Sequence, residues 1–183
     1  MSRPRLQPMN TAPTTRSDLT IRPAREADLP AISEIYNYYV DHSTCTYGMV
    51  HETLAERQAW FASHDPQHPV IVAVRNHPAG EEVIGWGALN VFNKRCAYKA
   101  TVENSVYLRH DLHGRGMGTR LMEELIRLAQ IIGHHTIIAG ISADQAPSVA
   151  LHAKLGFVKV AELREVGYKF GRWLDVIYMQ RML

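Results

Sequence analysis

A glycine-rich turn is the part of this sequence whose residue types point most directly to ligand chemistry. Gly114, Gly116 and Gly118 alternate where an expected strand ends and an expected helix begins. Glycines at such a turn let the backbone take positive φ angles and approach a ligand closely. The first turn of the helix adds unpaired N–H groups and a partial positive charge. The pattern favours a pyrophosphate site, although a flexible turn without a ligand has the same composition.

Two common phosphate-binding motifs do not fit this turn. A Walker loop closes with Gly-Lys-Ser/Thr, which does not occur here. A dinucleotide-binding fingerprint needs a third glycine at a different spacing, and the strand before this turn lies in the middle of the chain. The sequence therefore indicates a phosphate-binding turn of another kind.

The elements that must position the turn follow from the spacing of apolar residues. A strand over residues 99–108 precedes it, and an amphipathic helix over 117–132 follows it. Further strands are expected over residues 19–22, 70–75, 82–92, 136–141, 157–163 and 173–181, and further helices over 29–41, 53–61 and 146–155. Hairpins dominate the first half and strand–helix–strand units the second, which predicts a mixed α/β sheet with helices on both faces.

Two positions carry residue types that are typical of helix N-termini. Asp28 precedes the first expected helix and is predicted to be its N-cap, with Pro30 in the first turn. Thr53 and Glu56 have the spacing of a capping box and are predicted to open the second helix.

Composition excludes several classes of function. A chain of 183 residues suits one domain, and a formal net charge of +2 does not favour nucleic acid or an anionic membrane. The two cysteines and ten histidines have no metal-binding spacing, so we expect no metal. Residues 1–18 lack the apolar stretch of a secretory signal and are expected to be a disordered tail before a single domain over 19–183. Two isolated thiols favour a cytoplasmic location.

Several stretches resemble a known family in the right order. They are IYNYYV (35–40), AYKATVENSVYL (97–108), HGRGMG (113–118), PSVALHAKLGF (147–157) and GYKFGRWLDV (167–176). The chain resembles the GCN5-related N-acetyltransferase (GNAT) family, and most closely its phosphinothricin / methionine sulfoximine acetyltransferase branch, over residues 20–182. The resemblance implies an acyl-CoA N-acyltransferase fold, with a mostly antiparallel sheet splayed between its fourth and fifth strands. It also implies a homodimer.

The resemblance implies acetyl-CoA as co-substrate, held at the glycine turn and along the strand before it. His113 stands where the family usually has Gln or Arg, and Gln145 stands where it usually has Asn. The residues expected to contact the coenzyme are Val106, Tyr107, Leu108, His113, Gly114, Arg115, Gly116, Met117, Gly118, Thr119 and Gln145.

Acetyl transfer to an amine needs a base and a polarised thioester carbonyl. By the match to Thr-Val-Glu, Glu103 is expected to be the general base, although a structural strand carboxylate would look the same in sequence. His152 is expected to donate a proton to, or contact, the coenzyme sulfur; a polar helix residue is the alternative. The resemblance also implies that the acceptor amine is bound by Asn93, Lys94, Arg95, Glu103, Asn104 and Ser105.

Two other functions stay open from the sequence. One is acetylation of protein N-termini or polyamines, which would need a long acidic groove that no acidic cluster predicts. The other is a non-catalytic acyl-CoA-binding module, which would keep the glycine turn and would not need Glu103.

Overall fold

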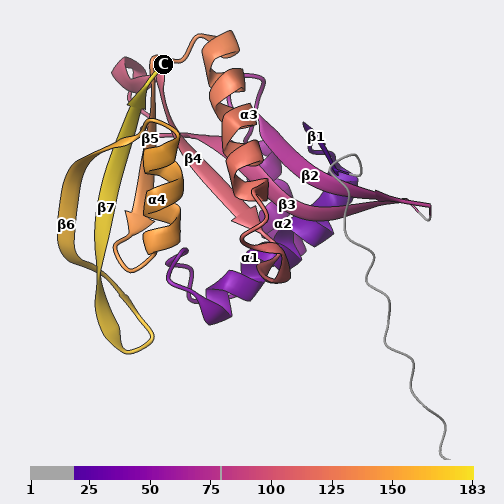
Figure 1. Ribbon diagram of the computed structural model, residues 1–183, viewed down its shortest axis with the longest axis horizontal. Coiled ribbons are helices and arrows are strands. Elements are labelled where there is room, and N and C mark those ends of the chain that lie inside the picture. Colours follow the sequence, from indigo (N-terminus) through magenta and orange to yellow (C-terminus); the bar gives the residue numbers. More distant parts are fainter. Residues whose placement is uncertain (1–18, 79) are drawn as a thin grey trace, which may run out of the picture.

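The computed structural model describes residues 19–78 and 80–183, with strands and helices in the expected order (Figure 1). The predicted tail over residues 1–18 lies outside the described residues. The strands are β1 (Leu19–Pro23), β2 (Val70–His77), β3 (Gly80–Val91), β4 (Thr101–Leu108), β5 (Thr136–Ser142), β6 (Val158–Lys169) and β7 (Arg172–Met182). The helices are α1 (Leu29–His42), α2 (Leu54–Ala62), α3 (Met117–Ile132) and α4 (Ala146–Lys154).

The seven strands form one sheet in the order β1-β2-β3-β4-β5-β7-β6. Neighbouring strands are antiparallel except β4 and β5, which run parallel. β4 pairs with β3 from Val102 to Leu108, but with β5 only from Thr101 to Glu103. Beyond Glu103 the two strands separate, so one edge of β4 loses its partner. The predicted mixed sheet and its split between the fourth and fifth strands are confirmed.

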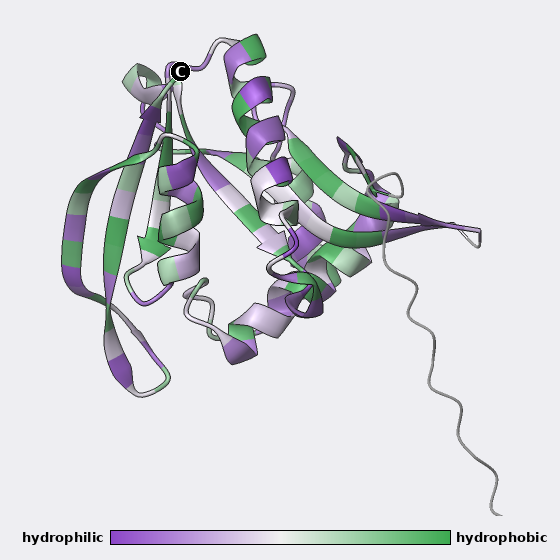
Figure 2. Cartoon of the chain, viewed as in Figure 1, coloured by the Kyte–Doolittle hydropathy of each residue, from purple (hydrophilic) through white to green (hydrophobic). Residues whose placement is uncertain are grey.

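Helices cover both faces of the sheet because side chains alternate along each strand. On β2, Val70, Val72 and Val74 belong to the core under α1, whereas Ile71 and Ala73 belong to the core under α3. Figure 2 shows the matching pattern of apolar and polar residues alternating along the helices. The predicted placement of helices on both faces is confirmed, and the glycine turn lies on the α3 face.

α3 starts directly after the glycine turn, as predicted. Its buried residues include Met117, Leu121, Leu125 and Ala129, a spacing that forms one apolar stripe. The helix ends at Gly133, whose φ of 91° suits only glycine well. Among the described residues, no helix is both long and apolar enough to cross a membrane.

The two predicted caps differ in outcome. Thr53 and Glu56 form the capping box of α2, with the Glu56 N–H donating to Thr53 Oγ1. Asp28 occupies the N-cap position of α1, but its side chain does not cap that helix. Its carboxylate accepts instead from Arg22 Nη1 at 2.7 Å and from the Arg25 N–H at 2.8 Å. The charged partner on β1 therefore outcompetes the helix amides.

Two strand boundaries also need correction. β4 begins at Thr101 rather than residue 99, because Cys96–Tyr98 form a short 3-10 turn. β6 extends beyond residue 163 to Lys169. Nearly every β6 residue is exposed, so no alternation of buried and exposed positions marks this strand in the sequence. Backbone pairing with β7 defines it instead.

Arg57 of α2 is a buried cation inside an aromatic cage. Its side chain is 2% exposed, and its Nη2 lies 2.5 Å from Glu52 Oε2. The guanidinium carbon lies 4.7 Å from the ring centre of Tyr36, 4.6 Å from that of Trp60 and 5.3 Å from that of Trp86. Burial lowers the pKa of Arg57, and the ion pair and the three ring faces offset the lost hydration. The cage ties α1, α2 and β3 together.

Candidate active site

A cavity opens where β4 and β5 separate. It is lined by Tyr39 of α1, residues 44–47, and parts of β4, the glycine turn, the start of α3, β5, α4 and β7. The predicted site residues that line it are Glu103, Asn104, Ser105, Val106, Tyr107, Leu108, His113, Gly114, Gly116, Met117, Gly118, Thr119, Gln145 and His152. The split in the sheet thus brings together residues from distant parts of the chain.

The glycine turn has the conformation that its composition predicts. Gly114 has a φ of 75° and Gly116 a φ of 79°, in the left-handed region that disfavours a side chain. A Cβ at either position would meet no atom within 4 Å, so backbone conformation rather than crowding requires glycine. Gly116 is the N-cap of α3 and brings no side chain to the first helical N–H groups. Those of Met117 and Gly118 are therefore open to an anion.

Tyr39 of α1 connects the glycine turn to the end of β4. Its hydroxyl donates to the Leu108 carbonyl oxygen at 2.5 Å. The same hydroxyl oxygen lies 2.6 Å from His113 Nε2, and it accepts there because its own proton is used. His113 therefore carries its proton on Nε2 when neutral, which leaves Nδ1 for any other partner.

Glu103 lies where the sheet splits. It pairs with Ile138 in the last matched position between β4 and β5. A Cβ built on Gly140 would lie 3.2 Å from Glu103 Oε1 and 3.5 Å from the ring of Tyr178, so the carboxylate lies beside both residues. Burial raises the pKa of Glu103 above its usual range. A partly buried carboxylate with increased proton affinity, facing a cavity, suits a general base.

His152 and Asn104 form a polar pair on the α4 side of the cavity. His152 Nδ1 donates to the Ser148 carbonyl at 2.8 Å, which leaves Nε2 to accept from Asn104 Nδ2 at 3.0 Å. Burial lowers the pKa of His152, so the ring is neutral near pH 7. Asn104 Nδ2 also lies 3.4 Å from Met122 Sδ, on the α3 face. In this geometry His152 Nε2 holds a lone pair, so its role as proton donor stays a prediction.

Residues 44–47, which follow the C-cap of α1, form another wall of the cavity. Thr44 donates to Asp144 Oδ1 at 2.7 Å and accepts from Gln145 Nε2 at 2.7 Å. Gln145 therefore lines the cavity, as expected, and also has a partner within the chain. Its contact with a coenzyme stays a prediction.

Comparison with known proteins identifies the family. The family described as the acetyltransferase (GNAT) domain matches residues 21–178. The chain belongs to the GNAT family of acetyltransferases. It is an N-acetyltransferase, as the resemblance implied.

Three relatives show how close the similarity is. The L-methionine sulfoximine/L-methionine sulfone acetyltransferase of Pseudomonas aeruginosa is 40% identical over 162 residues, covering 88% of this chain and 92% of the relative. A phosphinothricin acetyltransferase from Sinorhizobium meliloti, solved in complex with AcCoA, has a TM-score of 0.85 at 36% identity and covers 91% of this chain and 89% of its own. A ribosomal-protein-alanine N-acetyltransferase from Brucella melitensis has a TM-score of 0.83 at 36% identity. The match covers 90% of this chain and 99% of the Brucella chain. The predicted fold is confirmed.

Four predicted residues of this GNAT enzyme lie outside the cavity. Asn93, Lys94 and Arg95 are exposed in the loop after β3, and Arg115 is exposed on the glycine turn. Asn93 Oδ1 accepts from the Arg95 N–H at 3.0 Å, which folds the loop back on itself. β3 ends at Val91, and the three side chains of this loop are not among those that line the cavity. The expected contact between Arg95 and the acceptor stays a prediction.

Two residues that border Glu103, Gly140 and Tyr178, were not expected from the sequence. Gly140 is the only glycine in β5, and a lone glycine within a strand signals close approach by another group. That signal was available. No local feature of the sequence marked Tyr178 of β7. It lies beside the Glu103 carboxylate only because it pairs with Gly140 in the sheet.

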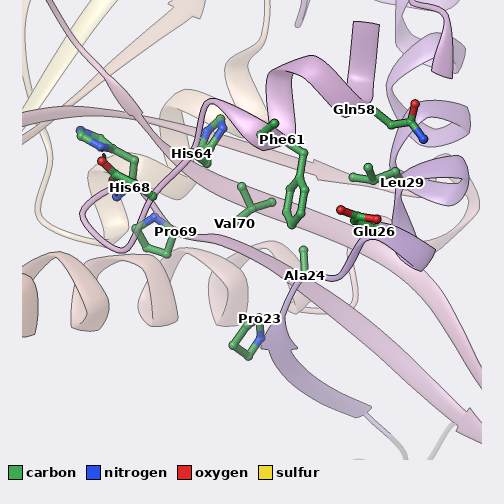
Figure 3. A pocket seen from close by; sticks show the side chains of 12 residues that line it. Pro23, Ala24, Glu26, Leu29, Gln58, Phe61, His64, His68, Pro69 and Val70 are labelled. Carbon is green, nitrogen blue, oxygen red and sulfur yellow. Dashed lines mark hydrogen bonds and ion pairs between the residues drawn. The ribbon is translucent and has the colours of Figure 1, made fainter. Parts of the chain in front are cut away.

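A second hollow lies beside α2 and shares no lining residue with the cavity between β4 and β5 (Figure 3). It is lined by residues that include Leu29, Phe61, His64, His68 and Val70. His64 bonds to the Trp60 carbonyl at 2.8 Å and His68 to Asp65 at 2.9 Å, so both histidines have local partners. Across residues 19–78 and 80–183, no group of three or more His, Cys, Asp or Glu is placed to hold a metal.

Proposed function

We propose that this enzyme transfers the acetyl group of acetyl-CoA to the amine of a small amino-acid-like acceptor, of the phosphinothricin, methionine sulfoximine or methionine sulfone type. One observation carries the proposal: a single cavity holds an open helix N-terminus, an unpaired strand edge and the partly buried Glu103. Similarity to the Pseudomonas and Sinorhizobium enzymes supports the acceptor class.

The residues of the cavity fit acetyl-CoA. The N–H groups of Met117, Gly118 and Thr119 would hold the pyrophosphate at the start of α3. Beyond Glu103, β4 has no partner on its β5 side, so its peptide groups near Val106 are available to an extended pantetheine arm, which would add like a strand. Bound acetyl-CoA supplies an acetyl group activated as a thioester.

Glu103 would take the proton of the acceptor ammonium, directly or through a water molecule. The free nitrogen then attacks the acetyl carbonyl carbon, and the carbon–sulfur bond breaks. A backbone N–H on the free edge of β4, near Val106, would stabilise the negative charge that develops on the carbonyl oxygen. The nitrogen loses a second proton as the amide forms. His152 Nε2 would take that proton, giving up its contact with Asn104, and pass it to the departing sulfur.

The cavity lining favours a small acceptor over a polyamine or a protein N-terminus. Among its residues Glu103 is the only carboxylate, whereas a polyamine would need several. Tyr47 and Tyr178 also line the cavity, and Tyr178 lies beside Glu103. A non-catalytic acyl-CoA-binding module would have no use for a carboxylate whose pKa is raised by burial.

An acceptor screen tests this proposal. The enzyme, given acetyl-CoA, should release free thiol with phosphinothricin, methionine sulfoximine or methionine sulfone, and mass spectrometry should find the acetyl group on nitrogen. We expect kcat/KM for the best of these to exceed that for spermidine or an alanine-terminated peptide by at least about tenfold. A preference for the peptide would indicate protein acetylation. Coenzyme binding without turnover of any acceptor would indicate a binding module.

We also propose a homodimer that uses the outer edge of β6. This strand ends the sheet and exposes Val158, Val160, Leu163 and Val166, each more than two-fifths accessible. An exposed apolar edge strand favours pairing with a second copy. Sedimentation at micromolar concentration should give twice the chain mass of 20.7 kDa. Val160→Lys should shift the protein to the monomer with an unchanged circular dichroism spectrum; a monomeric parent protein would contradict the proposal.

We propose a cytoplasmic location for the enzyme. Cys45 and Cys96 are both exposed free thiols, which supports a reducing compartment.

A further inference from the structure

Lys169, at the end of β6, is a buried cation that the proposed chemistry does not use. The residue is 3% exposed. Its Nζ donates to the carbonyl oxygens of Tyr39 at 3.3 Å, Ser43 at 2.7 Å and Thr46 at 2.8 Å. The three N–H donors of the ammonium are therefore all used. Burial lowers the pKa of Lys169.

All three oxygens belong to the end of α1 and the segment after it. Tyr39 lies in the last turn of α1, Ser43 is the C-cap, and Thr46 lines the cavity. Carbonyls at a helix C-terminus carry partial negative charge, which attracts a cation. The Tyr39 carbonyl oxygen also accepts from the Ser43 N–H at 3.1 Å. Residues 43–47 form neither helix nor strand, so no backbone ladder fixes them. The ammonium gives them a fixed anchor.

Gly167 provides a second, independent contact from the same hairpin. A Cβ built at Gly167 would lie 2.3 Å from Tyr47 Cε2, so the tyrosine ring lies directly against the backbone of β6. Gly167 is not among the residues with positive φ, which means that space rather than conformation requires glycine here. Any side chain at this position would displace the ring of Tyr47, a residue that lines the cavity.

We infer that Lys169 and Gly167 are positioning residues that hold residues 44–47 as the acceptor-side wall of the cavity. The β6–β7 hairpin, which contributes neither the base nor the glycine turn, thereby determines how the acceptor is placed before Glu103. The role in catalysis rests on the proposed function. The anchoring itself does not, because it follows from contacts between residues of the chain.

Lys169→Met tests the inference by removing the ammonium while keeping an unbranched chain. We expect the KM for the acceptor to rise at least about tenfold, and the Kd for acetyl-CoA to change less than about twofold. Lys169→Arg keeps a cation and should recover part of the acceptor affinity. Lys159→Met, on an exposed lysine of the same strand, is the matched control and should change neither constant.

Hydrogen exchange separates this inference from the proposed function, because it needs no turnover. The backbone amides of residues 44–48 should exchange at least about tenfold faster in Lys169→Met and in Gly167→Ala, while those of α3 keep the parent rates. If Lys169→Met does not fold, Gly167→Ala carries the test alone. Parent-like exchange at 44–48 together with a parent-like acceptor KM in a folded variant would overturn the inference.

Discussion

Glu103→Gln is expected to lower kcat/KM for acetyl transfer by about 10²–10⁴-fold, the usual contribution of a general base. The amide has nearly the same shape as the carboxylate but cannot accept the amine proton. Because the glycine turn is untouched, the Kd for acetyl-CoA should stay within about twofold of the parent value. Glu123→Gln, on an exposed glutamate of α3, is the matched control and should retain full activity. Full activity in Glu103→Gln would rule out this base.

The pH dependence of kcat/KM is a second test of Glu103 as the general base. Burial raises the pKa of Glu103, so the acid limb of kcat/KM should lie above the ordinary carboxyl range. Activity should fall as the pH drops through that value, because the protonated acid cannot act as a base. In Glu103→Gln the limb should disappear from whatever activity remains. A limb that persists unchanged would assign it to another group.

The stability of Glu103→Gln should move in the opposite direction from its activity. The folded protein holds the Glu103 proton more tightly than the unfolded chain does, since desolvation raises the folded pKa. Stability from this group is therefore fully present below the unfolded pKa and is lost as the pH rises through the folded pKa. At pH 7 the buried charge costs stability, so the glutamine variant should unfold at the same or a higher temperature. Calorimetry at pH 5 and pH 8 measures this difference.

Arg57→Ala is expected to lower the free energy of unfolding by about 3–5 kcal/mol, because it removes one partner of a buried ion pair. It also removes the cation from the faces of Tyr36, Trp60 and Trp86. For a chain of this size the loss corresponds to a fall in melting temperature of roughly 10 °C. Urea denaturation followed by circular dichroism gives the free energy directly.

Two further variants identify which part of the cage matters. Arg57→Met keeps most of the buried volume, and Glu52, whose side chain is 33% exposed, can still reach water. Arg57→Met should therefore lower the free energy of unfolding by less than Arg57→Ala does. Gln58→Ala changes the exposed neighbour on the same helix and should stay within about 0.5 kcal/mol of the parent. If Arg57→Ala were as mild as Gln58→Ala, the cage would have no structural role.

Local patterns in the sequence were enough to predict most of the fold and part of the site. The alternation of glycines at 114, 116 and 118 predicted a strand-to-helix turn, and Gly114 and Gly116 have the positive φ that requires them. The capping box of Thr53 and Glu56 and the apolar stripe of α3 formed as expected. These features depend on interactions between residues a few positions apart, so their information is contained in short stretches.

Features that depend on distant partners could not be predicted in this way. Asp28 appeared to be a helix cap, but Arg22 of β1 takes its carboxylate. The exposed strand β6 carries no periodic pattern and is defined only by its pairing with β7. The resemblance implied that Asn93, Lys94 and Arg95 bind the acceptor. They lie exposed outside the cavity, and their contact with the acceptor stays a prediction.

The sequence by itself determined the kinds of groups available: a glycine turn before an amphipathic helix, and a carboxylate within a strand. The tertiary structure decided which of them meet. It separated β4 from β5 after Glu103, set Tyr178 beside that carboxylate, and used Lys169 to fix the segment after α1. The physical reason is range: turn conformation and helix periodicity arise from local sterics, whereas strand register and buried ion contacts arise only when the whole sheet is assembled.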